Sequence, residues 1–150
     1  MHERLMESPV GLLTLRAEGG ALTAVLFGDR RTGLPGEDPA LDQAEAELRE
    51  YFAGSRKAFT APVRLSGTDF QIEVWNALRE IPYGATATYG EIARRIGRPR
   101  ACRAVGMANH RNAVPILIPC HRVVGAGGAL TGYAGGLEVK SFLLALERRG

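Results

Sequence analysis

Residues 88–109 constrain the fold more than any other part of this chain, because turn-forming residues divide them into two short helices. Thr88 and Glu91 have the spacing of a capping box, in which a hydroxyl and a carboxylate three residues apart satisfy the free backbone groups at a helix start. Gly97-Arg98-Pro99 ends this first helix, since proline cannot continue it. A second helix is expected over residues 101–109. Two short helices joined by a tight turn predict a helix-turn-helix unit.

The second of these helices carries almost no bulky side chains. Its small residues are Ala101, Cys102, Ala104, Gly106 and Ala108. Such a helix can approach another backbone closely, and two interpretations stay open. It packs against a neighbouring element of the protein, or it lies on the floor of a narrow DNA groove with Arg103 projecting past the backbone. We expect Cys102 to be a small buried residue; the alternative is a second reactive thiol.

The first 65 residues predict a small α+β domain without visible chemistry. Residues 10–16 and 21–27 alternate loosely around a Glu-Gly-Gly turn and predict a β-hairpin. Asp38 can cap a helix that starts at Pro39 and ends at Gly54. Residues 57–65 are expected to form another strand.

A second domain is expected over residues 66–150, which makes the whole chain an α+β protein. It opens with a helix that ends near Pro82-Tyr83-Gly84. The apolar face of that helix is formed by Phe70, Val74, Ala77 and Leu78.

Charge is distributed unevenly between the two halves. Residues 1–65 hold eight Lys and Arg against ten Asp and Glu, whereas residues 66–150 hold eleven against six. No acid lies between Glu91 and Glu138, and the arginines of that window are Arg94, Arg95, Arg98, Arg100, Arg103, Arg111 and Arg122. This distribution indicates a polyanion such as nucleic acid as partner of the second half. The alternative is a solvated arginine-rich face, since only two of the 19 basic residues are lysines.

Several classes of protein are disfavoured by composition. No apolar run approaches the ~20 residues that span a bilayer, and the N-terminal residues lack the apolar core of a secretory signal. Two cysteines and three histidines show no metal-ligand spacing, and no glycine pattern suggests a nucleotide cofactor. We therefore expect a cytoplasmic protein that uses no metal, no cofactor and no membrane.

The most reactive segment is residues 115–124, where four apolar or proline residues precede Pro119, Cys120 and His121. A thiol becomes nucleophilic as the thiolate, and an adjacent imidazole or a positive region lowers its pKa. Adjacent residues of an extended chain point in opposite directions, so Cys120 and His121 are expected to communicate through water or a turn. The alternative is an inert core cysteine and a histidine that only packs.

The residues of this segment resemble a known family, the methylated-DNA–protein-cysteine S-methyltransferases (O6-alkylguanine-DNA alkyltransferases). The resemblance is close over about residues 68–148 and only in outline before that. Its most specific motif is Pro119-Cys120-His121-Arg122-Val123. Further matches are Asn112, Pro115, Gly132-Tyr133, Gly135-Gly136-Leu137, Lys140, Leu143-Leu144, Glu147, Phe70-Gln71, Val74-Trp75, Ile81-Pro82-Tyr83-Gly84, Tyr89-Gly90 and Arg103-Ala104-Val105-Gly106.

The resemblance implies a role for each of several residues. Cys120 accepts the alkyl group, and His121 acts as its base through a water, oriented by Glu147. Asn112 braces the turn between the recognition helix and the reactive segment. Tyr89 donates a hydrogen bond to the leaving guanine, and Arg103 fills the gap left by a flipped nucleotide. Other residues expected to contact substrate or DNA are Thr88, Ala104, Gly106, Arg111, Arg122, Tyr133, Ala134 and Gly135.

The resemblance also implies a fold and a partner. We expect a ribonuclease-H-like N-terminal domain and a winged-helix-like C-terminal domain that binds the minor groove of double-stranded DNA containing O6-alkylguanine, as a monomer. Three positions depart from the family pattern: Ala113 stands where many members have proline, Ala134 where some have serine, and Leu146 where histidine is frequent. Zinc ligands found in some members are missing, so metal-free folding is expected.

The expected reaction is direct-reversal repair, in which the alkyl group of O6-alkylguanine, and less so of O4-alkylthymine, passes irreversibly to Cys120. The damaged base must leave the stack, which costs a few kcal/mol. A non-catalytic sensor of alkylated DNA is the alternative, although sensors of this kind have another residue at the cysteine position. A cysteine hydrolase is a second alternative, for which the sequence offers no oxyanion motif.

Overall fold

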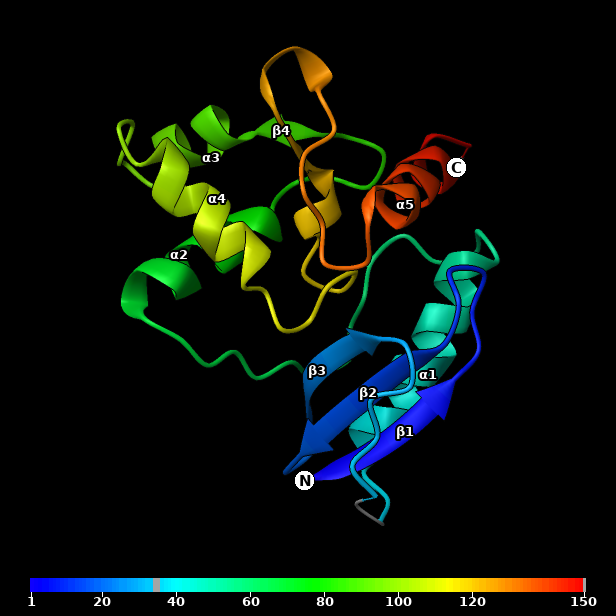
Figure 1. Cartoon of the computed structure of the whole chain (residues 1–150). Helices are drawn as coiled ribbons and strands as arrows, with labels where there is room; N and C mark the ends of the chain where they lie inside the picture. The colour runs from blue at the N-terminus through cyan, green and yellow to red at the C-terminus, as the bar shows by residue number, and fades with distance from the viewer. Residues whose placement is uncertain (34–35, 150) are drawn as a thin grey trace. The chain divides into compact units, whose positions relative to one another are not determined.

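Three antiparallel strands and one helix form the first unit of the computed structural model, which describes residues 1–33 and 36–149 (Figure 1). The strands are β1 (His2–Met6), β2 (Leu13–Glu18) and β3 (Ala21–Phe27), in the order β1-β2-β3. Helix α1 (Pro39–Phe52) contacts all three strands through its apolar face. Its start is as predicted, because the Asp38 side chain accepts a hydrogen bond from the Ala40 N–H at 2.9 Å.

Two parts of this unit differ from the sequence prediction. Strand β1 was not predicted, and residues 57–65 form no strand but a single bridge between Leu22 and Val63. Pro62 can only accept a hydrogen bond there, because it has no N–H. The open edge of β3 is shared by two short segments, since Leu22 N–H donates to Pro62 O and Val25 N–H donates to Ala113 O.

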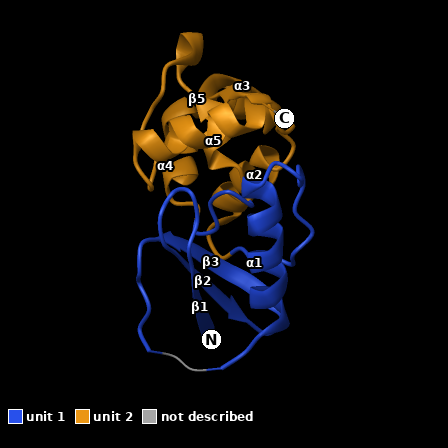
Figure 2. Cartoon of the chain, turned by 90° about the vertical axis from the view of Figure 1, so that its right-hand side faces the viewer, with its two compact units in different colours: residues 1–65, 113–117 blue, residues 66–112, 118–150 orange. Residues whose placement is uncertain are grey.

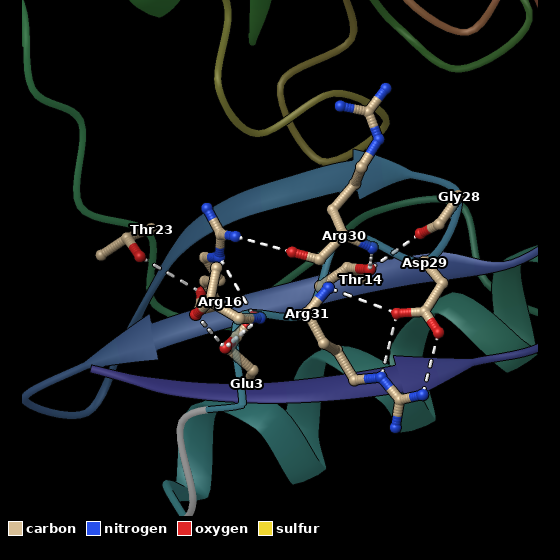
Figure 3. A network of polar contacts seen from close by, with 9 residues as sticks. Glu3, Thr14, Arg16, Thr23, Gly28, Asp29, Arg30 and Arg31 are labelled. Atoms are coloured by element: carbon tan, nitrogen blue, oxygen red, sulfur yellow. Dashed lines mark hydrogen bonds and ion pairs between the residues drawn. The ribbon is translucent and has the colours of Figure 1, made fainter.

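A polar network ties the segment after β3 to the sheet (Figure 3). Thr14 Oγ1 donates to Gly28 O at 2.7 Å and accepts from Arg30 N–H at 2.8 Å. Arg16 donates to Arg30 O at 2.9 Å and lies 3.4 Å from a Glu3 carboxylate oxygen. The Arg16 side chain therefore helps to hold the segment after β3 against the sheet.

The second unit is mainly helical. This agrees with the predicted α+β class, in which the C-terminal domain is a helix-turn-helix unit. Helix α2 (Asp69–Leu78) begins with a capping box, and α3 (Tyr89–Arg95) begins with the one predicted at Thr88 and Glu91. Helix α4 (Cys102–His110) follows after the expected break. Trp75 Nε1–H donates to Ala108 O at 2.8 Å, which fixes α2 against the small-residue helix α4. The first interpretation of α4, close packing on a protein neighbour, therefore holds for part of its surface.

A two-stranded parallel sheet joins distant parts of this unit. Strand β4 (Ala87–Thr88) pairs with β5 (Val123–Val124), which follows the short 3-10 helix η1 (Cys120–Arg122). A second 3-10 turn, η2 (Ala126–Gly128), leads through a loop to α5 (Leu137–Arg149). The pairing of β4 with β5 brings the start of α3 and the end of the cysteine segment side by side.

The chain divides into two compact units (Figure 2). Unit 1 comprises residues 1–65 and 113–117, and unit 2 comprises residues 66–112 and 118–150. Residues 113–117 therefore pack with the first unit, whereas the domain boundary at residue 65/66 stays a prediction. No helix within the described residues is long and apolar enough to cross a membrane.

Candidate functional site

Cys120 lies at the start of η1 and is held by hydrogen bonds on both sides. Pro119 has φ −80° and ψ 63°, the geometry of an inverse γ-turn, and Cys120 N–H donates to Ile118 O at 2.7 Å. Asn112 Nδ2 donates to the same Ile118 oxygen at 2.8 Å, and Asn109 Nδ2 lies 3.4 Å from Cys120 O. Asparagines of α4 and its end thus fix the backbone that carries the thiol, which is only 5% exposed.

Burial raises the pKa of the Cys120 thiol to about 11. A hydrogen bond with the Asn112 side chain and the positive charge of Lys140 act in the opposite direction, but desolvation of the thiolate is larger. From the sequence we expected the adjacent imidazole and the basic surroundings to lower this pKa. That expectation is wrong for the free protein, because desolvation of the buried thiolate outweighs the effects that lower the pKa. The resting site therefore holds a neutral thiol.

We predict that Cys120 of the free protein reacts slowly with iodoacetamide at pH 7, because a pKa near 11 leaves about one thiolate in ten thousand molecules. The rate should rise about tenfold per pH unit between pH 7 and 10. The rate is measured by intact mass in a Cys102→Ser background, because Cys102 is exposed and would also be labelled. A rate that levels off near pH 7 would contradict the raised pKa.

The carboxylate of Glu147 is the centre of the buried polar cluster beside Cys120. His121 Nε2 lies 2.6 Å from Glu147 Oε2, and Gly84 N–H donates to Oε1 at 3.3 Å. Arg122 binds both carboxylate oxygens, Nε to Oε1 at 2.8 Å and Nη2 to Oε2 at 3.0 Å. His121, Arg122 and Glu147 are all at most 6% exposed.

Arg122 therefore does not occupy the place that the sequence analysis gave it. It was expected to contact substrate or DNA from the basic face. Instead its guanidinium is buried, pairs with Glu147, donates to Ile81 O at 2.7 Å and lies over the Tyr83 ring at 5.8 Å. The expectation failed because Arg122 was counted with the other arginines of the acid-free window, whereas its partner Glu147 lies 25 residues further along the chain.

The carboxylate also fixes the tautomer of His121. An ionised carboxylate accepts hydrogen bonds only, so the Glu147 that binds Arg122 requires the histidine hydrogen on Nε2. Nδ1 then carries the lone pair, and it is buried without a hydrogen-bond partner among the described residues. Burial lowers the pKa of His121, although Glu147 acts to raise it. The imidazole is therefore neutral at pH 7 and can accept a proton at Nδ1.

Tyr89, Thr131 and Lys140 form a second polar cluster in this unit. The hydroxyl of Tyr89 is hydrogen-bonded to Thr131 Oγ1. Lys140 is fully buried, and its Nζ donates to Val123 O at 2.7 Å. Sequence reasoning gave no role to Thr131 or Lys140. The signal for Lys140 was its place on α5, where it shares an apolar face with Leu143 and Leu144.

Helix α4 presents the expected DNA-facing residues to solvent. Arg103, Ala104 and Arg111 are exposed. A surface hollow of about 500 Å³ is lined by Arg103, Gly106, Met107, His110 and Arg111. A Cβ added at Gly106 would lie 3.7 Å from the Tyr89 ring, an ordinary van der Waals contact, so Gly106 lies next to that tyrosine.

Cys102, at the start of α4, is exposed. The expectation that it is a small buried residue is therefore wrong. Small size alone cannot tell whether a helix position faces a neighbouring element or solvent, and Cys102 lies on the solvent side.

The other expected contact residues have mixed positions. Thr88 uses its hydroxyl in the cap of α3, where it accepts from Glu91 N–H at 3.1 Å. Tyr133 is buried, whereas Ala134 is exposed and Gly135 is intermediate. Tyr133, Ala134 and Gly135 lie in the loop that leads to α5. Their contacts with a substrate stay a prediction.

Comparisons with known proteins agree over the whole chain. Residues 69–149 match the family model described as 6-O-methylguanine DNA methyltransferase, DNA binding domain, and residues 1–65 match its ribonuclease-like domain. The methylated-DNA–protein-cysteine methyltransferase of Mycolicibacterium paratuberculosis is 50% identical over 97% of this chain and 92% of its own length. That of Methanosarcina acetivorans is 48% identical over 98% of both chains. The crystal structure of Mycobacterium tuberculosis OGT in complex with DNA has a TM-score of 0.93 and 48% identity, and covers 99% of this chain and 94% of that one.

Proposed function

Because this chain belongs to the 6-O-methylguanine DNA methyltransferase family, we propose that it repairs duplex DNA by moving the alkyl group from O6 of guanine, and less so from O4 of thymine, to Cys120. The observation that carries the proposal is the buried thiol of Cys120 beside His121, whose basic nitrogen is set by the Glu147 carboxylate.

The chemistry requires a thiolate only at the moment of transfer. The thiol proton of Cys120 passes through a water to Nδ1 of the neutral His121, and Glu147 stabilises the imidazolium that forms. The Sγ–carbon bond forms while the carbon–O6 bond breaks, and the bonding electron pair moves onto guanine. A hydrogen bond from Tyr89 stabilises that charge. Guanine then takes up a proton from solvent, and the imidazolium releases one.

The product explains why one molecule acts once. A thioether is not a leaving group at neutral pH, and no residue described near Cys120 has a role in removing the alkyl group. The acceptor is therefore consumed by the reaction, and the expected stoichiometry is one alkyl group per protein chain.

The proposal is tested by mixing the protein with duplex DNA that carries a single O6-methylguanine. Intact mass spectrometry should show the gain of one methyl group, and peptide mapping should place it on Cys120. Unmethylated duplex of the same sequence is the control. Tight binding of the methylated duplex without any mass gain would favour the alternative, a sensor of alkylated DNA. Repeated turnover of an ester or amide would favour a cysteine hydrolase.

Base flipping adds a role for Arg103, which we propose fills the stack after the damaged nucleotide leaves it. Arg103 is exposed on α4 beside Gly106 and Met107, where the helix has little bulk. Extrusion of a base costs a few kcal/mol, and a stacked guanidinium offsets part of that cost.

We predict that Arg103→Ala slows methyl transfer from duplex DNA by about tenfold or more, because the variant must extrude the base unaided. Transfer from the free base O6-benzylguanine should change less than twofold, since no stack has to be opened. Both rates are measured in single-turnover experiments, with the neighbouring exposed Arg100→Ala as matched control. Equal losses on the two substrates would argue against the flipping role.

A further inference from the structure

Thr131 lies between the phenol of Tyr89 and the ammonium of Lys140. Its Oγ1 is hydrogen-bonded to the Tyr89 hydroxyl. On its other side, Lys140 Nζ lies 3.4 Å from Oγ1 and 3.3 Å from the carbonyl oxygen of the same residue. These three residues come from three separate segments, namely the start of α3, the loop before α5, and α5 itself.

Lys140 is firmly placed in this cluster. Its side chain is fully buried, and the shortest of its contacts is the 2.7 Å hydrogen bond to Val123 O in β5. A buried ammonium acts on neighbouring groups through a low dielectric, so its effect on a hydroxyl close by is stronger than it would be in water. Thr131 is the polar side chain that contacts both Lys140 and Tyr89.

One arrangement of these hydrogen bonds leaves the Tyr89 hydrogen available for a substrate. An ammonium only donates, so Thr131 Oγ1 accepts from Lys140. The Thr131 hydroxyl keeps one hydrogen, and either oxygen of the Tyr89–Thr131 pair can be the donor. When Thr131 donates, Tyr89 accepts and its own hydrogen can be given to a further acceptor.

We propose that Thr131 is a positioning residue for the transfer reaction: it carries the polarisation of Lys140 to Tyr89 and turns the Tyr89 hydrogen toward the leaving guanine. The inference rests on the proposed function, in which Tyr89 stabilises the charge on guanine. The phenol becomes a better donor when its oxygen accepts a hydrogen bond from a chain that begins at a cation. Thr131 itself touches neither the sulfur nor the alkyl carbon in this scheme.

The test compares four proteins in a Cys102→Ser background, namely Thr131→Val, Thr131→Ser, Tyr89→Phe and the double variant Tyr89→Phe/Thr131→Val. Valine keeps the shape of threonine without its hydroxyl, and serine keeps the hydroxyl. The first measurement is the single-turnover rate of methyl transfer from O6-methylguanine duplex at saturating DNA. The second is alkylation of Cys120 by iodoacetamide, whose iodide leaves without help from a hydrogen-bond donor.

We expect Thr131→Val to transfer methyl about tenfold more slowly, and Thr131→Ser to stay within about twofold of the parent. Alkylation by iodoacetamide should change less than about twofold in both. The double variant should be no slower than Tyr89→Phe alone, because residues that act through one group are not additive.

Three results would overturn the inference. Additive losses in the double variant would mean that Thr131 acts independently of Tyr89. An equal loss of the iodoacetamide rate would mean that the Thr131→Val substitution only disturbs the loop. A Thr131→Ser protein as slow as Thr131→Val would mean that the Thr131 hydroxyl has no role in the transfer. Failure of the inference alone leaves methylation of the parent protein intact. Failure of the proposed function appears as a parent protein that takes up no methyl group.

Discussion

Replacing Cys120 with alanine is expected to abolish methyl transfer while the protein still binds methylated duplex DNA within about threefold of the parent affinity. Sulfur is the only atom of this side chain that can accept the alkyl group, so no fraction of the reaction survives. Binding is expected to persist because Arg103 on α4 and Arg111 just after it, both exposed, are unchanged. Intact mass after incubation with methylated duplex measures transfer, and an electrophoretic shift measures binding.

The matched control is Cys102→Ala, which removes the other, exposed thiol of the chain and should transfer at the parent rate. Cys120 is 5% exposed, so its alanine variant loses some packing, and a fall in stability of about 1 kcal/mol is expected. Loss of both transfer and binding would indicate an unfolded site rather than a missing nucleophile. Methylation of Cys102 in the Cys120→Ala protein would contradict the assignment.

Local signals in the sequence predicted the parts of the fold that depend on neighbours in the chain. The Thr88–Glu91 capping box, the Asp38 cap and the helix break near Gly97 all rest on contacts within a few residues, and the structure has each of them. Strand β1 and the bridge at Val63 depend on pairing with distant strands. Their register could not be predicted from short charged or proline-containing segments.

The candidate site likewise has features that the local sequence predicted and features that depend on distant parts of the chain. The Pro119-Cys120-His121 motif identified the thiol and the imidazole, but not the direction in which burial shifts the Cys120 pKa. Desolvation depends on every element that covers a group, and a sequence pattern does not contain that information. The roles assigned to Asn112, Tyr89 and Arg103 stay predictions.

The backbone conformation of the segment before Cys120 could also not be predicted from the sequence. Ile116 has φ +75°, a region that β-branched residues rarely adopt, and it is buried. Such a residue costs on the order of 1–3 kcal/mol and persists because its surroundings hold it there. Nothing in the apolar run of residues 115–118 distinguishes this residue from its neighbours.

Replacing Arg122 with methionine is expected to destabilise the protein by about 3–5 kcal/mol, because it leaves the buried Glu147 carboxylate without its charged partner. The Ile81 carbonyl loses its 2.7 Å donor as well. Methionine keeps most of the apolar stem, so the loss reports the guanidinium rather than a cavity. Denaturant unfolding of the free protein, followed by circular dichroism, measures the change.

The exposed pair of Arg98 and Glu73 supplies the matched control. Its atoms lie 3.4 Å apart and its side chains are 55% and 44% exposed, so Arg98→Met should cost less than about 1 kcal/mol. The double variant Arg122→Met/Glu147→Leu should be more stable than Arg122→Met alone. The second substitution removes the Glu147 carboxylate, whose buried charge the loss of Arg122 leaves unpaired.

The same variant separates the two positions considered for Arg122. If the arginine were a DNA contact on the basic face, Arg122→Met would leave the free energy of unfolding within about 0.5 kcal/mol of the parent and weaken DNA binding in a salt-dependent way. The buried geometry predicts the reverse order, a large loss of stability in the absence of DNA.

Because Arg122 also acts to lower the pKa of His121, its removal should raise that pKa. Transfer by the folded variant should then decline at a higher pH than in the parent as the solution is acidified, since a protonated imidazole cannot take the thiol proton.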